Sequence, residues 1–266
     1  MAERPIAAVT GASSGIGAVF ARKLAARGYD LLLIARRKDR LDHLGAELAG
    51  TYGIEAESIA ADLAEDADVE SLASRLRAER HLGMLVNNAG FGVKGHFFKT
   101  PVDAQDRMHR VHVMATVRLT HAALQPMIAN DTGAIINVAS VAAYARSEGN
   151  LSYCATKSWM TVFTEGLHLD LRGVGSHVQV QALCPGYTHT EFHDTMGVAK
   201  YKPGSSLWMN ADDVVEESLR GIERGKLFVV PGLPYKLVTA IVPKLPAGLR
   251  VWMERRNPQS KGRVEP

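Results

Sequence analysis

The stretch VTGASSGIGAVF (residues 9–20) joins a short apolar run to a segment whose apolar residues recur at helical spacing. Its glycines, Gly11, Gly15 and Gly17, follow a Gly-xxx-Gly-x-Gly pattern. Glycines permit a tight turn and a close approach of a ligand to the backbone. A helix that begins directly after such a turn offers unpaired N–H groups and a partial positive charge to a phosphate. The stretch therefore predicts a strand, a pyrophosphate-binding turn and a helix.

The same order of strand and helix recurs along the chain. Between segments with helical spacing, short runs rich in Val, Ile, Leu and Ala predict strands at residues 6–10, 30–35, 54–60, 83–88, 133–140, 177–184 and 226–230. Strands that alternate with helices form βαβ units and a parallel sheet that is covered on both faces. We find no internal repeat or linker that would divide the chain, and therefore expect one α/β domain.

Composition limits the class of protein. Of the 266 residues, 46% are hydrophobic and 22% are charged, and the net charge of +3 is too small to indicate nucleic-acid binding. Two cysteines, Cys154 and Cys184, do not make a disulfide framework. The opening MAERPIAAVTGASS lacks the apolar core of a signal peptide, and no apolar run reaches the roughly 18 residues of a membrane span. These features predict a soluble, cytoplasmic protein.

The second predicted strand ends in LLLIARRKDR (31–40) and bears on the choice of cofactor. A dinucleotide fold that binds NAD usually has an acidic residue here for the ribose hydroxyls, whereas an arginine accommodates a 2′-phosphate. Arg36 and Arg37 follow the strand, and no carboxylate precedes Asp39. Guanidinium groups match phosphate geometry. The sequence predicts NADP(H) in preference to NAD(H), with the alternative that Arg37 is only a solvated charge at a helix start.

Six motifs in this order resemble the short-chain dehydrogenase/reductase family over roughly residues 5–230. They are TGASSGIG (10–17), ADL (61–63), NNAG (87–90), NVAS (137–140), YCATK (153–157) and PGYTHT (185–190). The resemblance implies a single Rossmann-like, doubly wound domain over residues 1–232, with a seven-stranded parallel sheet flanked by helices. Residues 233–266 would form a basic, apolar extension. The nucleotide would bind at the carboxyl ends of the strands.

By the same resemblance, residues at several strand ends contact the cofactor. Ser13, Ser14 and Ile16 would line the phosphates, Asp62 and Leu63 would flank the adenine, Asn88, Ala89 and Gly90 would support the cofactor from the fourth strand, and Pro185, Gly186, Thr188 and Thr190 would border the nicotinamide and its phosphate.

The segment SYCATK (152–157) carries the expected chemistry. Tyr153 and Lys157 are four residues apart, so on a helix they share one face. A phenol has a pKa of about 10, and a nearby ammonium lowers it toward the working range. In the family-like mechanism, Ser140 and Tyr153 contact the carbonyl oxygen of the substrate, the nicotinamide delivers hydride, and Tyr153 transfers the proton. Lys157 would also hold the nicotinamide ribose.

These residues predict an NADP(H)-dependent oxidoreductase that acts on a carbonyl or secondary alcohol. The alternative is a catalytically silent NADP-binding sensor or scaffold protein. Non-catalytic relatives typically lose the tyrosine or the lysine. Here Ser140, Tyr153 and Lys157 are all present, which favours an enzyme.

One position departs from the family pattern. Where the family usually has an asparagine that helps to seat a proton-relaying water, the segment RVHVMA has His112. Three interpretations are open. His112 substitutes in the relay and makes the rate more dependent on pH, it is a neutral, satisfied buried histidine, or it marks lost catalysis.

The segment at about 187–212 is expected to close over the substrate. Phe192, Met196 and Trp208 would form an apolar lid that suits a hydrophobic ketone or aldehyde, although Trp208 could instead simply pack against the helix that follows it. His189 and His193 are four residues apart, but no carboxylate-rich set accompanies them, so we expect no metal site.

The tail is basic. From Lys236 onward lie seven of the 31 lysines and arginines but only two of the 28 acidic residues. It could pack at the substrate mouth, pack on a partner subunit, or lie on an anionic membrane surface, and we favour packing. The family resemblance also implies a homodimer or homotetramer through the long helices after the fourth and fifth strands.

Overall fold

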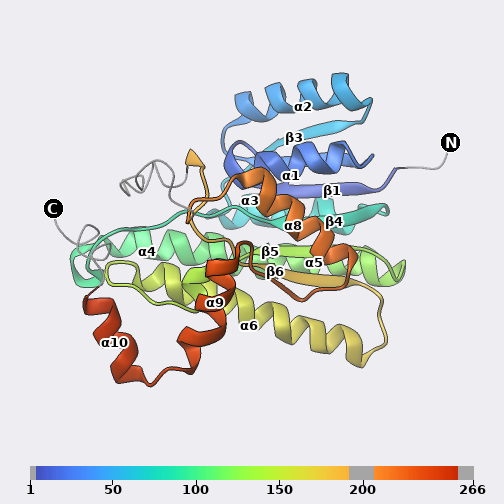
Figure 1. The fold of residues 1–266 in the computed structure, drawn as a ribbon. Coiled ribbons are helices and arrows are strands. Elements are labelled where there is room, and N and C mark those ends of the chain that lie inside the picture. The colour runs from blue at the N-terminus through green and yellow to red at the C-terminus, as the bar shows by residue number, and fades with distance from the viewer. Residues whose placement is uncertain (1–3, 192–206, 257–266) are drawn as a thin grey trace.

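The computed structural model describes residues 4–191 and 207–256. Within them, seven strands form one parallel sheet in the order β3-β2-β1-β4-β5-β6-β7 (Figure 1). The strands are β1 (Ile6–Thr10), β2 (Asp30–Ala35), β3 (Ala56–Ala60), β4 (Leu82–Asn87), β5 (Ala134–Val138), β6 (Gln179–Leu183) and β7 (Phe228–Val229). The predicted doubly wound, seven-stranded parallel sheet is confirmed.

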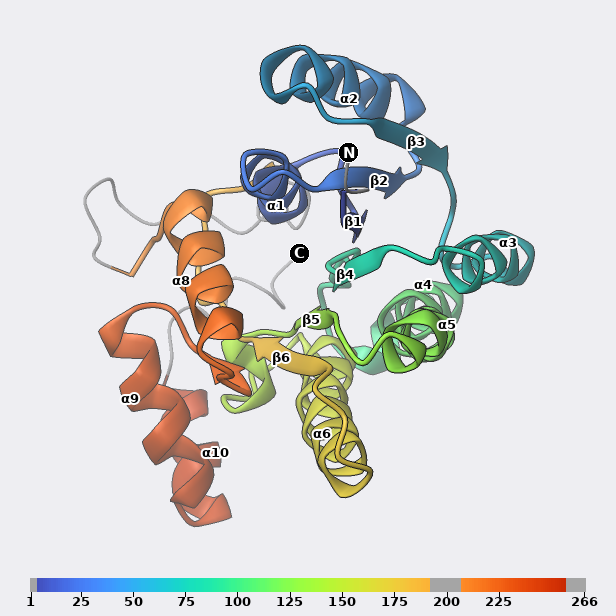
Figure 2. The same ribbon diagram turned by 90° about the vertical axis from the view of Figure 1, so that its right-hand side faces the viewer.

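Helices cover both faces of this sheet (Figure 2). One face carries α1 (Gly15–Ala25), α2 (Lys38–Tyr52) and α8 (Ala211–Glu223). The other carries α3 (Asp66–Arg77), α5 (Thr116–Ala129) and α6 (Leu151–Gly173). The remaining helical elements are η1 (Phe97–Lys99), α4 (Val102–His109), the π-helical turn η2 (Arg110–Ala115), η3 (Val141–Ala143), α9 (Leu233–Ile241), η4 (Val242–Lys244) and α10 (Ala247–Arg255).

Two apolar cores, one on each face, explain why the strands read as continuous apolar runs. In β1, Ala7 and Val9 pack in the core with α1, α2 and α8, whereas Ala8 packs in the core with α3, α5 and α6. Successive side chains of a strand point to opposite faces of its sheet. A strand with helices on both faces therefore needs an apolar residue at every position.

The strand order reverses next to β1, and this reversal positions the site. The chain runs outward from β1 to β2 and β3, then returns to place β4 on the other side of β1. The connections that leave the carboxyl ends of β1 and β4 lead to helices on opposite faces of the sheet, α1 and α5, which makes this the switch point of the sheet. Ligands of open α/β sheets bind at such a point.

The C-terminal extension contains α9, η4 and α10, which lie beside one another at the margin of the molecule in both views (Figures 1 and 2). The division of the chain into a domain at 1–232 and an extension at 233–266 stays a prediction. No helix of the described part is both long and apolar enough to cross a bilayer.

Candidate active site

The glycine turn is built so that only glycine fits at two positions. Gly11 has a φ of +68°, and a Cβ on it would lie 2.7 Å from Nδ2 of Asn88. A Cβ on Gly17 would collide with the backbone oxygen of Gly11. The turn thus packs directly on the loop after β4. Helix α1 begins at Gly15, and the Ser14 side chain before it makes no capping hydrogen bond, so its first-turn N–H groups suit a phosphate.

Thr10 joins this turn to the predicted cofactor loop after β4. Its hydroxyl oxygen accepts hydrogen bonds from the backbone N–H groups of Asn88 (2.9 Å) and Ala89 (3.0 Å). The Asn88 amide in turn donates to the Thr10 carbonyl at 2.8 Å. The glycine turn and the NNAG segment are therefore held at a fixed distance, as a rigid dinucleotide site requires.

Arg37 points at the glycine turn. Its guanidinium donates to the hydroxyl of Ser13 at 3.0 Å and to that of Ser14 at 2.9 Å. It also forms an ion pair with Glu191 at 3.1 Å, and Arg40 binds the same carboxylate at 2.8 Å. These contacts do not fit a merely solvated charge at a helix start. Arg37 and Arg40 already hold one anionic group beside the turn.

Asp62 and Leu63 follow β3, as the motif predicts. Leu63 is buried, whereas the Asp62 carboxylate accepts hydrogen bonds from Arg107 (2.7 Å) and from the Ala64 N–H (3.0 Å). Partial burial opposes ionisation, but these bonds and the nearby charge of Arg36 lower the pKa of Asp62. Arg36 itself is exposed on the same side of the sheet.

Ser140 and Tyr153 come together at the carboxyl end of β5. Ser140 is the N-cap residue of η3, and its Oγ accepts a hydrogen bond from the Ala142 N–H at 3.1 Å. It is also hydrogen-bonded to the Tyr153 phenol, a bond that opposes the effect of burial on the pKa of Tyr153. Burial is the larger influence and raises that pKa to about 12. The two groups predicted to share a carbonyl oxygen are thus neighbours.

Lys157 lies one helical turn after Tyr153 on α6, and its side chain is buried. Its Nζ donates to the Val138 carbonyl at 2.7 Å and lies 5.7 Å from the centroid of the Tyr153 ring. Burial lowers the pKa of Lys157 to about 8. Its Nζ is directed at the Val138 carbonyl, and burial is the larger influence on the pKa of Tyr153, so the predicted lowering of that pKa by the ammonium stays a prediction.

His112 is completely buried and both of its ring nitrogens are bonded. Nε2 accepts the Phe91 N–H at 3.1 Å, and Nδ1 lies 2.9 Å from the hydroxyl oxygen of Thr156. Because the Thr156 hydroxyl donates its proton to the Tyr153 carbonyl (3.0 Å), Nδ1 must carry the hydrogen. Burial first, and then the charge of Lys157, put the pKa of His112 well below its usual value. These are the contacts of a neutral, satisfied histidine.

The local backbone is shaped around this imidazole. His112 lies in the π-helical turn η2 between α4 and α5, a distortion that recurs at functional sites. A Cβ on Gly90 would lie 2.7 Å from Nε2 of His112. Gly90, the glycine of the NNAG motif, therefore leaves room for the imidazole.

Tyr235 supports the PGYTHT segment, and sequence reasoning missed it. Its hydroxyl accepts the Tyr187 N–H at 3.1 Å and donates to the Leu207 carbonyl at 2.6 Å. Its ring lies against Gly186 so closely that a Cβ on the glycine would collide with it. No local pattern marks Tyr235, because its partners are distant in sequence.

The rest of this segment turns back toward the glycine loop. The buried Thr188 donates to the Gly186 carbonyl at 3.1 Å, and the Pro185 carbonyl accepts the Val141 N–H at 3.1 Å. The Thr190 side chain lies against Gly15, where an added Cβ would meet it at 3.1 Å. The predicted nicotinamide-side residues thus approach the phosphate turn.

Of the predicted lid residues, Phe192 and Met196 lie outside the described residues, as does His193. Trp208 stacks on His189 (4.9 Å between ring centroids) and on Tyr187 (5.4 Å). It therefore packs on the PGYTHT segment.

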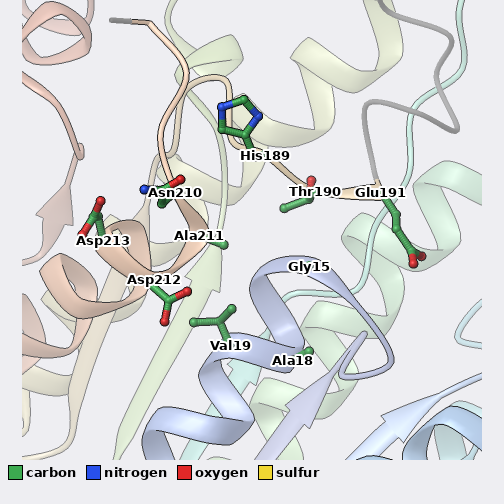
Figure 3. Close-up of a pocket in the computed structure, with 10 residues that line it drawn as sticks. All are labelled: Gly15, Ala18, Val19, His189, Thr190, Glu191, Asn210, Ala211, Asp212 and Asp213. Carbon is green, nitrogen blue, oxygen red and sulfur yellow. The ribbon is translucent and has the colours of Figure 1, made fainter. Parts of the chain in front are cut away.

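A cavity of about 510 Å³ lies beside the glycine turn (Figure 3). It is lined by the first turns of α1 and α8 and by residues 189–191. Ser140 and Tyr153 are not among its lining residues, so this cavity adjoins the glycine turn and not the two residues predicted to be catalytic.

Comparisons with known proteins agree with this geometry. A family model described as short chain dehydrogenase matches residues 5–199. The very-long-chain 3-oxoacyl-CoA reductase of Anas platyrhynchos is 32% identical over 212 residues, which make up 77% of this chain and 66% of that protein. The chain thus spans just under two thirds of the length of this curated relative.

Two solved structures are similar over more than nine tenths of the chain. A short-chain dehydrogenase from Sphingobium yanoikuyae in complex with NADPH is 34% identical with a TM-score of 0.82, and the match covers 96% of this chain and 97% of that one. A bulky-bulky ketone specific alcohol dehydrogenase from Comamonas testosteroni is 30% identical with a TM-score of 0.77, covering 91% and 95%.

Proposed function

Because the chain belongs to the short chain dehydrogenase family, whose members act on alcohol and carbonyl groups, we propose that it reduces the carbonyl group of a bulky apolar ketone or aldehyde with NADPH. The observation that carries the proposal is the contact between Ser140 and Tyr153, two hydroxyls at the carboxyl end of β5. Ser140 follows β5 at the same end of the sheet as the glycine turn after β1, and open α/β sheets bind their ligands at this end.

Tyr153 is the proton donor in this proposal. With a pKa of about 12, the phenol stays protonated at neutral pH, as a general acid must. NADPH, when bound, supplies a hydride to the carbonyl carbon. Tyr153 gives its proton to the carbonyl oxygen, and Ser140 donates a hydrogen bond to the same oxygen, so that the carbonyl becomes an alcohol. In the oxidising direction the phenolate accepts the proton.

Lys157 serves the cofactor in this proposal. With a pKa of about 8, its ammonium is charged at neutral pH, and one of its hydrogens is used by the Val138 carbonyl. An ammonium has three donors, which leaves capacity for the ribose hydroxyls of the nicotinamide nucleotide.

The preference for NADP(H) rests on Arg37. Its contacts with Ser13 and Ser14 put a guanidinium at the glycine turn, and Arg36 and Arg40 add charge nearby. A 2′-phosphate would take the place of the Glu191 carboxylate on Arg37 and Arg40. The complex of the Sphingobium yanoikuyae relative with NADPH supports this choice.

His112 is a positioning residue in this proposal. It links the loop at Phe91, which follows the cofactor-supporting NNAG segment, to Thr156 and so to the Tyr153 backbone. A neutral imidazole with both nitrogens bonded holds these elements together without changing its charge. This favours the second of the three interpretations of His112 over a titrating relay.

We further propose a homodimer or homotetramer. The outer surfaces of α5 and α6 expose apolar side chains, including Val117, Ile128, Val162 and Leu169, and paired helices would cover them. We also propose that the protein is cytoplasmic and that residues at about 187–212 form an apolar lid over the substrate.

The most direct test follows NADPH absorbance with a panel of ketones and aldehydes of increasing apolar bulk. We expect turnover that rises with bulk and a higher kcat/KM with NADPH than with NADH. Tight NADPH binding without turnover of any panel member, or a kcat/KM that favours NADH, would contradict the proposal.

A further inference from the structure

The C-terminal arm, defined here as residues 233–256, is tied to the body of the protein beside the active site. At one end, Tyr235 packs on Gly186 and bonds to Tyr187. At the other end, the Glu254 carboxylate accepts the N–H of Glu148 at 3.1 Å. Glu148 lies in the loop that leads into the Tyr153 helix. The arm therefore connects two loops that border the site.

Between these ties the arm is exposed and apolar. On α9, Leu233 (70% exposed), Leu237 and Ile241 follow at intervals of four residues and so share one face. Within the described span of α10 no residue is buried, and Trp252 is 50% exposed. Helices this short are marginal in water without packing. The arm presents an apolar surface that some partner would stabilise.

The arm also carries a net positive charge. Lys244, Arg255 and Arg256 are exposed and Arg250 is half-buried, whereas Glu254 is the one acidic residue in the sequence of the arm. Arg256 stacks on the Trp252 ring at 4.1 Å, which places a charge beside an apolar group.

Among residues 4–191 and 207–256, the charged groups near the two ends of the arm do not remove this excess of positive charge. Glu217 of α8 pairs with Lys236 at 2.7 Å, so these two charges cancel. In the loop before α6, the exposed Arg146 offsets the exposed Glu148.

The positive charge of the arm distinguishes between two possible partners, a second copy of this chain and a lipid surface. In a two-fold dimer through the arm, the positive charges of one copy would lie close to those of the other copy, and like charges repel at close range. An anionic lipid surface would neutralise them while the apolar residues enter the headgroup region. We propose that the arm docks this protein on anionic membranes, with the mouth of the active site turned toward the lipid. The supply of apolar carbonyl substrate from the bilayer is the part of this inference that rests on the proposed function.

The test is co-sedimentation of the full chain with phosphatidylcholine vesicles that contain either no phosphatidylserine or about one third of it. We expect binding to the anionic vesicles alone, weakened at 0.5 M salt roughly in line with charge screening. Removing one exposed positive charge, as in Arg255→Gln, should weaken binding about fivefold. The fluorescence of Trp252 should shift to shorter wavelength on binding, and Trp252→Phe should abolish that shift.

Leu237→Glu should remove vesicle binding, since it puts an acid on the apolar face. Val174→Glu is its matched control, because Val174 is 76% exposed where α6 leads into the amino end of β6, whereas the arm follows the carboxyl end of β7. Both variants should keep their turnover of a water-soluble ketone, so loss of binding and failure of the proposed activity are distinguishable. The inference is overturned if the protein binds neither kind of vesicle, binds both equally, or self-associates through a contact that Leu237→Glu breaks.

Discussion

The Nε2 atom of His112 accepts a hydrogen bond from the backbone N–H of Phe91, across 3.1 Å. Its other nitrogen is engaged by Thr156, so the imidazole has one tautomer and spans two parts of the site. Protonation would put a second hydrogen on Nε2, facing the Phe91 hydrogen. The structure therefore resists a charged form of His112, although a histidine in water titrates near neutrality.

His112→Asn should lower kcat without changing the shape of the pH–rate profile. Asparagine is shorter than the span between Phe91 and Thr156, so one buried group loses its partner at a cost of about 1–3 kcal/mol in the free energy of unfolding. Slight misplacement of Tyr153 should reduce kcat by about tenfold or more. Profiles from pH 5 to 9 and urea denaturation measure both effects. If an acidic limb of the wild-type profile disappears in the variant, His112 titrates during turnover and is not only a positioning residue.

Tyr153→Phe should reduce kcat by about 10²- to 10⁴-fold, because it removes the proton donor. Dissociation constants for NADPH, measured by fluorescence, should change little. Tyr52→Phe is the control, since Tyr52 is exposed at the end of α2. Full activity of the Tyr153 variant would refute the assignment.

The free energy of unfolding should depend on pH because the ammonium of Lys157 is buried. Its pKa is lowered to about 8 in the folded protein but is about 10.4 in an unfolded chain. Between these values the unfolded chain binds more protons, so stability rises with pH. Relative to Lys157→Met, which cancels the contributions of other groups, the wild type should gain about 1 kcal/mol between pH 8 and 9. A difference that stays constant or falls with pH would show that the ammonium is not destabilised by burial.

The Arg37 site should discriminate between the cofactors. Arg37→Ala should weaken NADPH binding about tenfold or more, since it removes charge-assisted hydrogen bonds, and should leave NADH binding nearly unchanged. Isothermal titration with the two cofactors measures this difference. Equal losses for both cofactors would mean that Arg37 supports the turn and does not read the 2′-phosphate.

Glu191→Gln should have the opposite effect, because the carboxylate competes for Arg37 and Arg40. Exposed ion pairs contribute little, so we expect NADPH to bind about twofold to fivefold tighter. Glu47→Gln is the control, as Glu47 pairs with Arg22 on the exposed surface between α1 and α2. Unchanged or weaker NADPH binding in Glu191→Gln would show that the carboxylate does not compete with NADPH for Arg37 and Arg40.

Much of the site was predictable because its signals are local. The positive φ of Gly11 and the i, i+4 relation of Tyr153 and Lys157 each depend on a few neighbouring residues. The parallel sheet followed from alternating apolar strands and amphipathic helices, since burial on both faces demands that pattern.

Other features needed the tertiary structure, because they depend on contacts between residues far apart in the chain. Lys157 is directed at the Val138 carbonyl, and burial is the largest influence on the pKa of Tyr153. Tyr235 supports a segment almost fifty positions earlier. The sequence by itself determined which groups stand at the strand ends. Only the fold decided how far water is excluded from them, and exclusion of water sets whether a phenol, an ammonium or an imidazole carries its charge.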